Sequence, residues 1–309
     1  MTALVETPKR VLPTLGGAKP ASVATPVPAP APSVLYYPMN RTLLFGAGGS
    51  GKTTSVTSIL RNPKLKLRVL GLDSNCIAAM VYSIRRMNLS LIPGQVVVSQ
   101  FVLSPAERAA FVRSFTTAAV GKAKSSGKDW VEKQMGDFTG IDLATGQSES
   151  CGGIHTFDQD TVLVIDSWTA FQNHLIRNFL SSNLGADWET YRAVQEYVTN
   201  YMTALWACVD CHVIVLAHSK ITDKQKGIRG AVIVPDIYGQ AAVQSFAGLF
   251  SDVLLCRNEG GKPVWVAREN GALTAVRNIP LELYPELKPA ACPPDFLDPR
   301  YSFFPPMEK

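Results

Sequence analysis

Residues 46–53 form the glycine-rich run that most constrains what this chain can fold into. They read GAGGSGKT, a full match to the phosphate-loop pattern G-x-x-x-x-G-K-[ST]. Glycines let the backbone take positive φ angles, so that successive N–H groups can face an anion. The flanking residues agree: Arg41–Phe45 is an apolar run of strand type, and Thr53–Leu60 can start a helix whose N-terminus faces the phosphates. The sequence therefore predicts a site for a nucleoside triphosphate.

The polar residues of this loop have separate expected roles. Lys52 is the point charge for the β- and γ-phosphates, and Thr53 offers its hydroxyl to Mg²⁺. We expect the nucleotide to be held by the loop and by the residue that follows it. These residues are Gly46, Ala47, Gly48, Gly49, Ser50, Gly51, Lys52, Thr53 and Thr54.

A carboxylate follows a second apolar run. In Thr161–Asp166, four apolar residues precede the acid, which is the pattern of a Walker B strand. Such a carboxylate lies beside the phosphate loop and can hold Mg²⁺ through water. Thr53 and Asp166 are therefore the predicted metal ligands. In many P-loop ATPases a Glu follows this Asp directly, but here the next residue is Ser167.

Hydrolysis also needs a group that orients the attacking water. Asp73 is the first candidate, because it ends the run Leu67–Asp73, whose strand can neighbour the phosphate-loop strand. The alternatives are that Asp73 is a helix cap or turn residue, and that Asp166 is the only acid. His218 follows the apolar run 213–217 and is either a sensor of the γ-phosphate or a histidine satisfied at a strand end. The predicted catalytic residues are Lys52, Asp73, Asp166 and His218.

The composition suits a soluble globular protein, with 309 residues of which 46% are hydrophobic and 18% charged. No apolar run approaches the ~20 residues of a membrane helix, and the N-terminus lacks the apolar core of a signal peptide. We therefore expect a cytoplasmic location and no membrane. The net charge of +5 permits nucleic-acid contact without requiring it. The one CxxC pair, Cys208 and Cys211, favours core or helix-end packing over metal or redox chemistry.

Strands and helices alternate between two proline-rich ends. We expect a disordered tail rich in proline and alanine over residues 1–35, an ATPase domain over 36–284 and a proline-rich tail over 285–309. Aromatic residues in the second tail suggest that parts of it lie against the domain or a neighbour. Residues 121–160 form a polar insert. The predicted fold is α/β, with a mainly parallel central sheet flanked by helices and an antiparallel edge hairpin formed by Asp252–Arg257 and Pro263–Arg268.

The order of these motifs resembles a family, the RecA-like P-loop ATPases carried by phages, which include phage nucleotide-binding proteins and single-strand annealing recombinases. The resemblance covers roughly residues 40–280. It rests on GAGGSGKTT, the strand that ends in Asp73, VLVIDSWTAF, HVIVLAHSK and VPDIYGQAAVQSFAGLFSDVLLC. It implies a RecA-like fold, ATP hydrolysis with Mg²⁺, and assembly on single-stranded DNA. The long N-terminal tail and the insert depart from the family pattern.

The stretch that follows His218 is the predicted nucleic-acid contact. It carries four cations in a glycine-containing loop, and Lys and Arg give affinity by neutralising phosphates. In the family that the chain resembles, the corresponding loop contacts DNA; the alternative is a solvated charged loop. A second basic patch surrounds Trp130 in the insert. The predicted contacts in the loop are Lys220, Lys224, Lys226 and Arg229.

RecA-like ATPases commonly complete their site with a cation from a neighbouring subunit. Arg268 and Arg277 are the candidates, in a homo-oligomeric ring or filament. The sequence thus favours a Mg²⁺-dependent ATPase acting on single-stranded DNA in phage-type recombination, repair or replication. The alternative is a nucleotide-dependent assembly or scaffold protein with little turnover, which the lack of a Glu after Asp166 and the long tails favour. A small-molecule kinase is disfavoured, because no lid-type arginine cluster is evident.

Overall fold

The computed structural model describes residues 39–116, 125–181, 188–222, 231–268, 272–279, 290–292 and 294–304. Contacts divide the chain into two units, Met1–Tyr36 and Tyr37–Lys309. The first unit, with the tail predicted for residues 1–35, lies outside the described residues. The predicted limits of the domain and of the two tails stay predictions.

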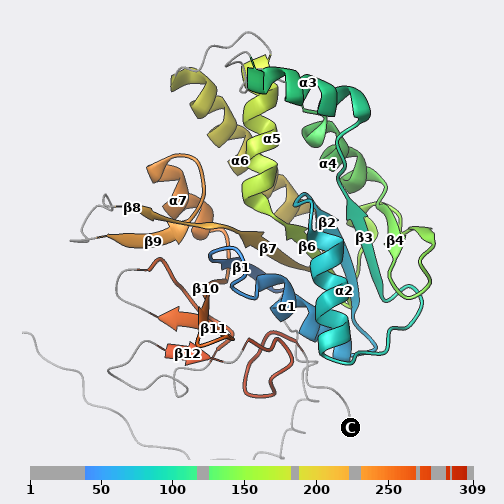
Figure 1. Ribbon diagram of the computed structural model, residues 1–309. Helices are drawn as coiled ribbons and strands as arrows, with labels where there is room; N and C mark the ends of the chain where they lie inside the picture. The colour runs from blue at the N-terminus through green and yellow to red at the C-terminus, as the bar shows by residue number, and fades with distance from the viewer. Residues whose placement is uncertain are drawn as a thin grey trace, which may run out of the picture. The chain divides into compact units, whose positions relative to one another are not determined.

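One large sheet runs through the second unit (Figure 1), with ten strands in the described part of the chain. Its six central strands are parallel, and antiparallel strands extend it on both sides. The central strands are almost wholly buried, as expected of a parallel sheet that is covered on both faces. The strand order is β12 (Ala290–Cys292), β11 (Lys262–Arg268), β10 (Asp252–Glu259), β1 (Arg41–Phe45), β7 (His212–Ala217), β6 (Thr161–Asp166), β2 (Lys66–Gly71), β3 (Val96–Gln100), β4 (Thr139–Asp142) and β5 (Ser148–Ser150).

Helices pack on both faces of this sheet. Side chains alternate across a strand, so in β1 Leu43 and Phe45 enter one core cluster and Leu44 enters the other. Trp168 of α5 and Met202 of α6 belong to the first cluster, and α1 and α2 cover the second. Among the described residues no helix is long and apolar enough to span a membrane. The helices are α1 (Lys52–Thr57), continued by the 3₁₀ turn Ser58–Arg61, α2 (Cys76–Arg86), α3 (Pro105–Thr116), α4 (Gly127–Gly136), α5 (Trp168–Ser181), α6 (Trp188–Cys208) and α7 (Gln240–Ala247).

The predicted fold class is confirmed: the core is α/β, with a mainly parallel sheet, flanking helices and an antiparallel hairpin near the C-terminus. Two details differ. The hairpin of β10 and β11 is not the edge of the sheet, because β12 pairs with β11 on its outer side. The predicted position of the Asp73 strand is wrong, since β7 and β6 lie between β1 and β2. These two strands are buried along their whole length and occupy the centre of the sheet.

Three further regions were not anticipated from the sequence. The described part of the insert is ordered, with α4 followed by β4 and β5, which extend the sheet beyond β3. Helix α5 begins two residues after the acid that ends β6, a segment in which no helix was expected. The strands β8 (Ser219–Thr222) and β9 (Val232–Pro235) form a separate antiparallel pair (Figure 1).

Residues 294–304, named the C-terminal segment here, pack on the domain. Their aromatic side chains are almost fully buried against the face that carries α1. The expectation that aromatic residues of this region lie against the domain is therefore confirmed. These residues are Phe296, Tyr301, Phe303 and Phe304.

Candidate nucleotide site

The phosphate loop joins β1 to α1 and has the backbone that its glycines were expected to supply. Gly49 and Gly51 have φ angles of 73° and 92°, a region that residues with side chains rarely adopt. Gly46 is required for a different reason, since a Cβ there would lie 2.3 Å from the carbonyl oxygen of Cys256 in β10. The loop therefore runs against the neighbouring strand as it turns into α1.

Lys52 is the first residue of α1, and its side chain returns over the loop. Its Nζ donates to the carbonyl oxygens of Gly46, at 2.8 Å, and Ala47, at 2.9 Å. Burial lowers the pKa of Lys52, and nearby groups, Asp166 among them, oppose this shift. The ammonium group is thus held within the loop, where a phosphate would bind.

The two predicted metal ligands come together. The Thr53 hydroxyl donates to Oδ2 of Asp166 at 3.2 Å, although 113 residues separate them in the sequence. Burial, and then the nearby Asp73, raise the pKa of Asp166, whereas the hydrogen bond from Thr53 lowers it. A buried carboxylate beside a hydroxyl at the end of a central strand fits the oxygen ligands that Mg²⁺ prefers. Cys76, a buried thiol beside Asp166, was not predicted from the sequence; burial raises its pKa strongly.

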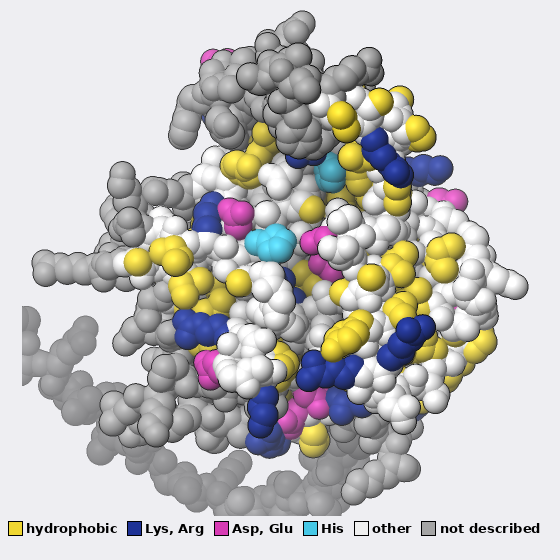
Figure 2. Space-filling model, viewed as in Figure 1, with side chains coloured by type: hydrophobic (Ala, Val, Ile, Leu, Met, Phe, Trp, Pro, Cys, Tyr) yellow, Lys and Arg dark blue, Asp and Glu magenta, His cyan; other side chains and the backbone are white. Residues whose placement is uncertain are grey.

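Asp73 lies two residues beyond the end of β2 and close to the predicted sensor. Its Oδ2 is 3.9 Å from Nε2 of His218, which follows β7. The other oxygen accepts a hydrogen bond from the backbone N–H of Asn75 at 3.2 Å, so Asp73 also stabilises the turn before α2. Figure 2 shows a histidine between acidic side chains near the middle of this face. Because one carboxylate oxygen of Asp73 holds the turn and the other lies near His218, Asp73 can stabilise the turn and also act at the nucleotide.

Ser167 takes a structural position. Its hydroxyl accepts a hydrogen bond from the N–H of Ala170 at 3.3 Å, within the first turn of α5. In the same region, the N–H of His218 donates to the Thr169 hydroxyl at 3.0 Å. The start of α5 thus contacts the backbone that carries His218.

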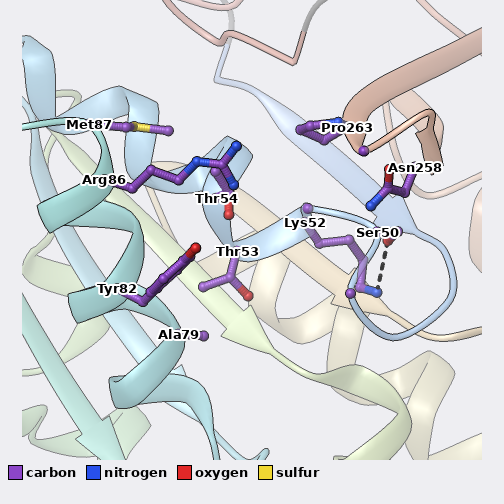
Figure 3. Close-up of a pocket in the computed structure, with 13 residues that line it drawn as sticks. Ser50, Lys52, Thr53, Thr54, Ala79, Tyr82, Arg86, Met87, Asn258 and Pro263 are labelled. Atoms are coloured by element: carbon purple, nitrogen blue, oxygen red, sulfur yellow. Dashed lines mark hydrogen bonds between the residues drawn. The ribbon is translucent and has the colours of Figure 1, made fainter.

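A cavity of about 520 Å³ opens beside the loop. Figure 3 shows its two walls, with Tyr82, Arg86 and Met87 on one side and Asn258 and Pro263 on the other. The first wall is the end of α2 and the second is the β10–β11 hairpin. These residues were not predicted from the sequence, because no local pattern indicates that α2 and the distant β10–β11 hairpin meet at the phosphate loop.

The predicted nucleic-acid residues are only partly described. The Lys220 ammonium lies 3.3 Å from the Asp236 carboxylate and donates to the carbonyl oxygen of Ile237. Lys224, Lys226 and Arg229 lie outside the described residues. The prediction for this loop is therefore untested, and Lys220 contacts groups of its own domain.

The remaining candidates are placed as follows. Arg268 ends β11, but its side chain lies outside the described residues. Arg277 is exposed, and its backbone N–H donates to Asp252 at 2.8 Å, at the opposite end of β10 from the phosphate loop. The Trp130 ring is partly buried, with its centroid 5.5 Å from that of Phe101, and the basic patch around it stays a prediction.

Of the CxxC pair, Cys211 packs in the core and Cys208, the last residue of α6, does not. Cys211 is buried, which raises its pKa to about 12, whereas Cys208 is exposed. Both are free thiols. In the described part of the chain, no group of three or more His, Cys, Asp or Glu side chains could hold a metal ion.

The strand order, the glycine loop and the hydroxyl–carboxylate pair define an α/β P-loop protein. No protein-family model matches the chain, and no curated protein is significantly similar to it. A solved structure titled "Crystal structure of the RadB recombinase" is similar at 14% sequence identity and a TM-score of 0.36, over 77% of this chain and 87% of that one. A likeness of this size does not establish a common fold, so the class rests on the chain's own topology and site.

Proposed function

We propose that this chain is a RecA-like ATPase that binds and hydrolyses ATP with Mg²⁺ and acts on single-stranded DNA in phage-type recombination, repair or replication. One observation carries the proposal. The carboxyl ends of four neighbouring strands bring together the phosphate loop, the Thr53–Asp166 contact of 3.2 Å, and the Asp73–His218 pair at 3.9 Å. Ligands of open α/β sheets bind at this end of the strands.

Each residue has a chemical role in this proposal. Lys52 and the loop N–H groups bind the β- and γ-phosphates, and Thr53 and Asp166 would hold Mg²⁺, which neutralises phosphate charge. Asp73 accepts the proton of a water molecule whose oxygen attacks the γ-phosphorus as the bond to ADP breaks. His218, beside Asp73, reports the γ-phosphate to the strand pair β8–β9 that follows it.

The cavity wall formed by α2 supplies a place for the nucleobase. Tyr82 is 63% exposed and lines the cavity together with Arg86. An exposed aromatic ring and a guanidinium plane at a cavity wall are both surfaces on which a base can stack. We therefore assign the base to this wall and the phosphates to the loop.

The DNA and oligomer parts of the proposal rest on the resemblance and on charge. The loop after β8, with Lys224, Lys226 and Arg229, would contact DNA phosphates, and Arg268 or Arg277 would serve a neighbouring subunit. Because Lys220 already pairs with Asp236, we place the DNA contact on the other three cations.

The experiment is ATP turnover measured with and without single-stranded DNA. DNA-stimulated turnover that is lost in Lys52→Ala and retained in Lys66→Ala, an exposed lysine at the start of β2, supports the proposal. Absence of nucleotide binding in the wild-type chain would refute it.

The second candidate, a nucleotide-dependent assembly protein with little turnover, is favoured by one observation. Ser167, at the position where many P-loop ATPases carry Glu, offers no carboxylate and accepts a hydrogen bond from the first turn of α5. This candidate predicts slow turnover that DNA does not stimulate, together with an oligomeric state that changes when ATP is added.

A further inference from the structure

A buried aromatic cluster lies behind the phosphate-loop helix, and none of its members lines the nucleotide cavity. Its centre is Trp265 of β11, which is completely buried. The ring centroid of Trp265 is 4.8 Å from that of Phe296 and 5.8 Å from that of Phe303, both in the C-terminal segment. Strand β11 and the C-terminal segment therefore share one core with α1.

Hydrogen bonds connect this cluster to the loop. The Trp265 indole N–H donates to the Ser55 hydroxyl at 3.2 Å, and this hydroxyl donates to the Gly51 carbonyl oxygen at 2.9 Å. A second connection comes from the C-terminal segment. The N–H of Phe296 donates to the Ser58 hydroxyl at 3.3 Å, which donates to the Ser55 carbonyl oxygen at 2.7 Å.

These hydrogen bonds end at the peptide group between Gly51 and Lys52, at the start of α1. Gly51, at φ 92°, precedes α1, and its carbonyl oxygen accepts both the N–H and the hydroxyl of Ser55. Because a peptide group is planar, holding this carbonyl also fixes the direction of the Lys52 N–H. That N–H is one of the unpaired donors at the helix N-terminus, which are the donors that bind phosphate.

Strand β11 contacts the loop at a second point. A Cβ placed on Gly51 would lie 2.5 Å from Cβ of Pro263. Pro263 and Trp265 are two residues apart, so they face the same side of the strand. The strand thus touches the loop directly at Pro263 and through Ser55 at Trp265.

We propose that Trp265 is a positioning residue for the phosphate loop, and that the C-terminal segment, by packing on Trp265 and binding Ser58, sets the affinity of the loop for nucleotide. This inference rests on the proposed function, because it assigns a role toward the same ligand. Coupling of this kind is reciprocal, so bound nucleotide stabilises the docked C-terminal segment by the same free energy.

The test uses the full chain with Ser55→Ala, Trp265→Phe and the double variant. The dissociation constant for Mg²⁺-ATP is measured by equilibrium dialysis, and folding is checked by urea unfolding. Trp265→Phe removes its hydrogen bond to Ser55, and Ser55→Ala removes that bond together with the one from Ser55 to the Gly51 carbonyl oxygen. We expect about fivefold weaker binding in Trp265→Phe and at least as large a loss in Ser55→Ala. The double variant should bind about as weakly as Ser55→Ala, because Ser55→Ala already breaks the bond that Trp265→Phe removes. The matched control is Phe246→Leu in α7, a buried aromatic of the opposite core cluster, which should retain wild-type affinity.

Hydrogen exchange gives a second readout. Adding Mg²⁺-ATP to the wild type should slow amide exchange in residues 294–304, and Trp265→Phe should reduce this protection. Wild-type affinity in Ser55→Ala and in Trp265→Phe, with unchanged exchange in the segment, would reduce the cluster to a purely structural role. If the wild type itself does not bind ATP, the proposed function fails instead, so the two failures are distinguishable.

Discussion

One histidine begins strand β7 and another follows its last residue, and the two differ in burial and in hydrogen bonding. His212, at the start, is buried; its Nδ1 accepts the N–H of Asn40 at 3.0 Å and its ring lies 4.8 Å from that of Phe304. His218, after the end, is partly exposed and lies 3.9 Å from a carboxylate oxygen of Asp73. His212 therefore contributes to the packing of the core, whereas His218 lies at the candidate site.

The same contrast holds for the two ends of the central sheet. At the amino ends, Asp252 is completely buried and accepts the backbone N–H groups of Arg277 and Asn278. At the carboxyl ends, Asp166 is buried and accepts a hydrogen bond from the Thr53 hydroxyl, the other predicted metal ligand. Acidic residues of similar burial thus serve the fold at one end and the site at the other. The predictions below test this division.

The largest effect is expected at the loop. Lys52→Ala should abolish ATP turnover and leave the free energy of unfolding nearly unchanged, because the residue supplies charge to the ligand rather than packing to the core. Turnover assays and urea unfolding measure the two quantities. Wild-type turnover in this variant would contradict the whole assignment of the site.

Asp73→Asn should slow hydrolysis by about 10²–10⁴-fold and spare nucleotide binding, the range expected for loss of a general base. Asp166→Asn should instead weaken the Mg²⁺-dependent turnover itself, because it removes a carboxylate ligand. Single-turnover hydrolysis and nucleotide binding are measured on the same samples. If Asp73→Asn hydrolyses ATP at the normal rate, Asp166 becomes the candidate base.

At the other end of the sheet the effect should fall on stability alone. Asp252→Ala removes the acceptor of the Arg277 backbone N–H and of the backbone and side-chain N–H groups of Asn278, which should cost about 3 kcal/mol of unfolding free energy. Turnover per folded molecule should stay unchanged. A selective loss of turnover in this variant would show that the two ends of the sheet are not independent.

The buried histidines give a pH dependence of stability. Burial lowers the pKa of His212, and likewise of His174, to about 4 from an ordinary value of 6.5. The unfolded chain therefore binds more protons between these values, so stability should be full above pH 6.5 and fall as the pH drops toward 4. Urea unfolding across this range measures the loss, and His212→Asn should flatten it. An unchanged pH profile in that variant would mean that other groups control the acid limb.

The smallest expected effect concerns DNA. Neutralising Lys224, Lys226 and Arg229 together should weaken single-strand binding at any sequence and lower the slope of log affinity against log salt by about 2, since each phosphate contact contributes about 0.7. ATP binding should survive. Neutralising Lys128 and Lys133 beside Trp130 is the comparison. An unchanged slope in the triple variant, with a lower slope in the pair, would move the DNA contact to the insert.

Local patterns in the sequence predicted much of the fold and the residues of the site that would contact the phosphates and Mg²⁺. The glycine run at 46–53, the apolar run that ends at Asp166 and the hairpin about Gly260 are all in the positions that their residues predict. Thr53 and Asp166 could be predicted as partners despite their separation in the sequence, because each belongs to a motif whose role is recognisable by itself. Helix α5 was missed because its apolar residues directly follow a buried strand and merge with it in the sequence.

The sequence by itself determined that a phosphate loop, two strand-end carboxylates and a strand-end histidine were available in this chain. Only the tertiary structure decided which strands lie side by side, and hence that Asp73 meets His218 across the buried strand β6. It also decided what stands behind the loop: Trp265 reaches Ser55 across 210 residues. Such contacts depend on how buried strands compete for the centre of the sheet, a property of the whole core that no local pattern records.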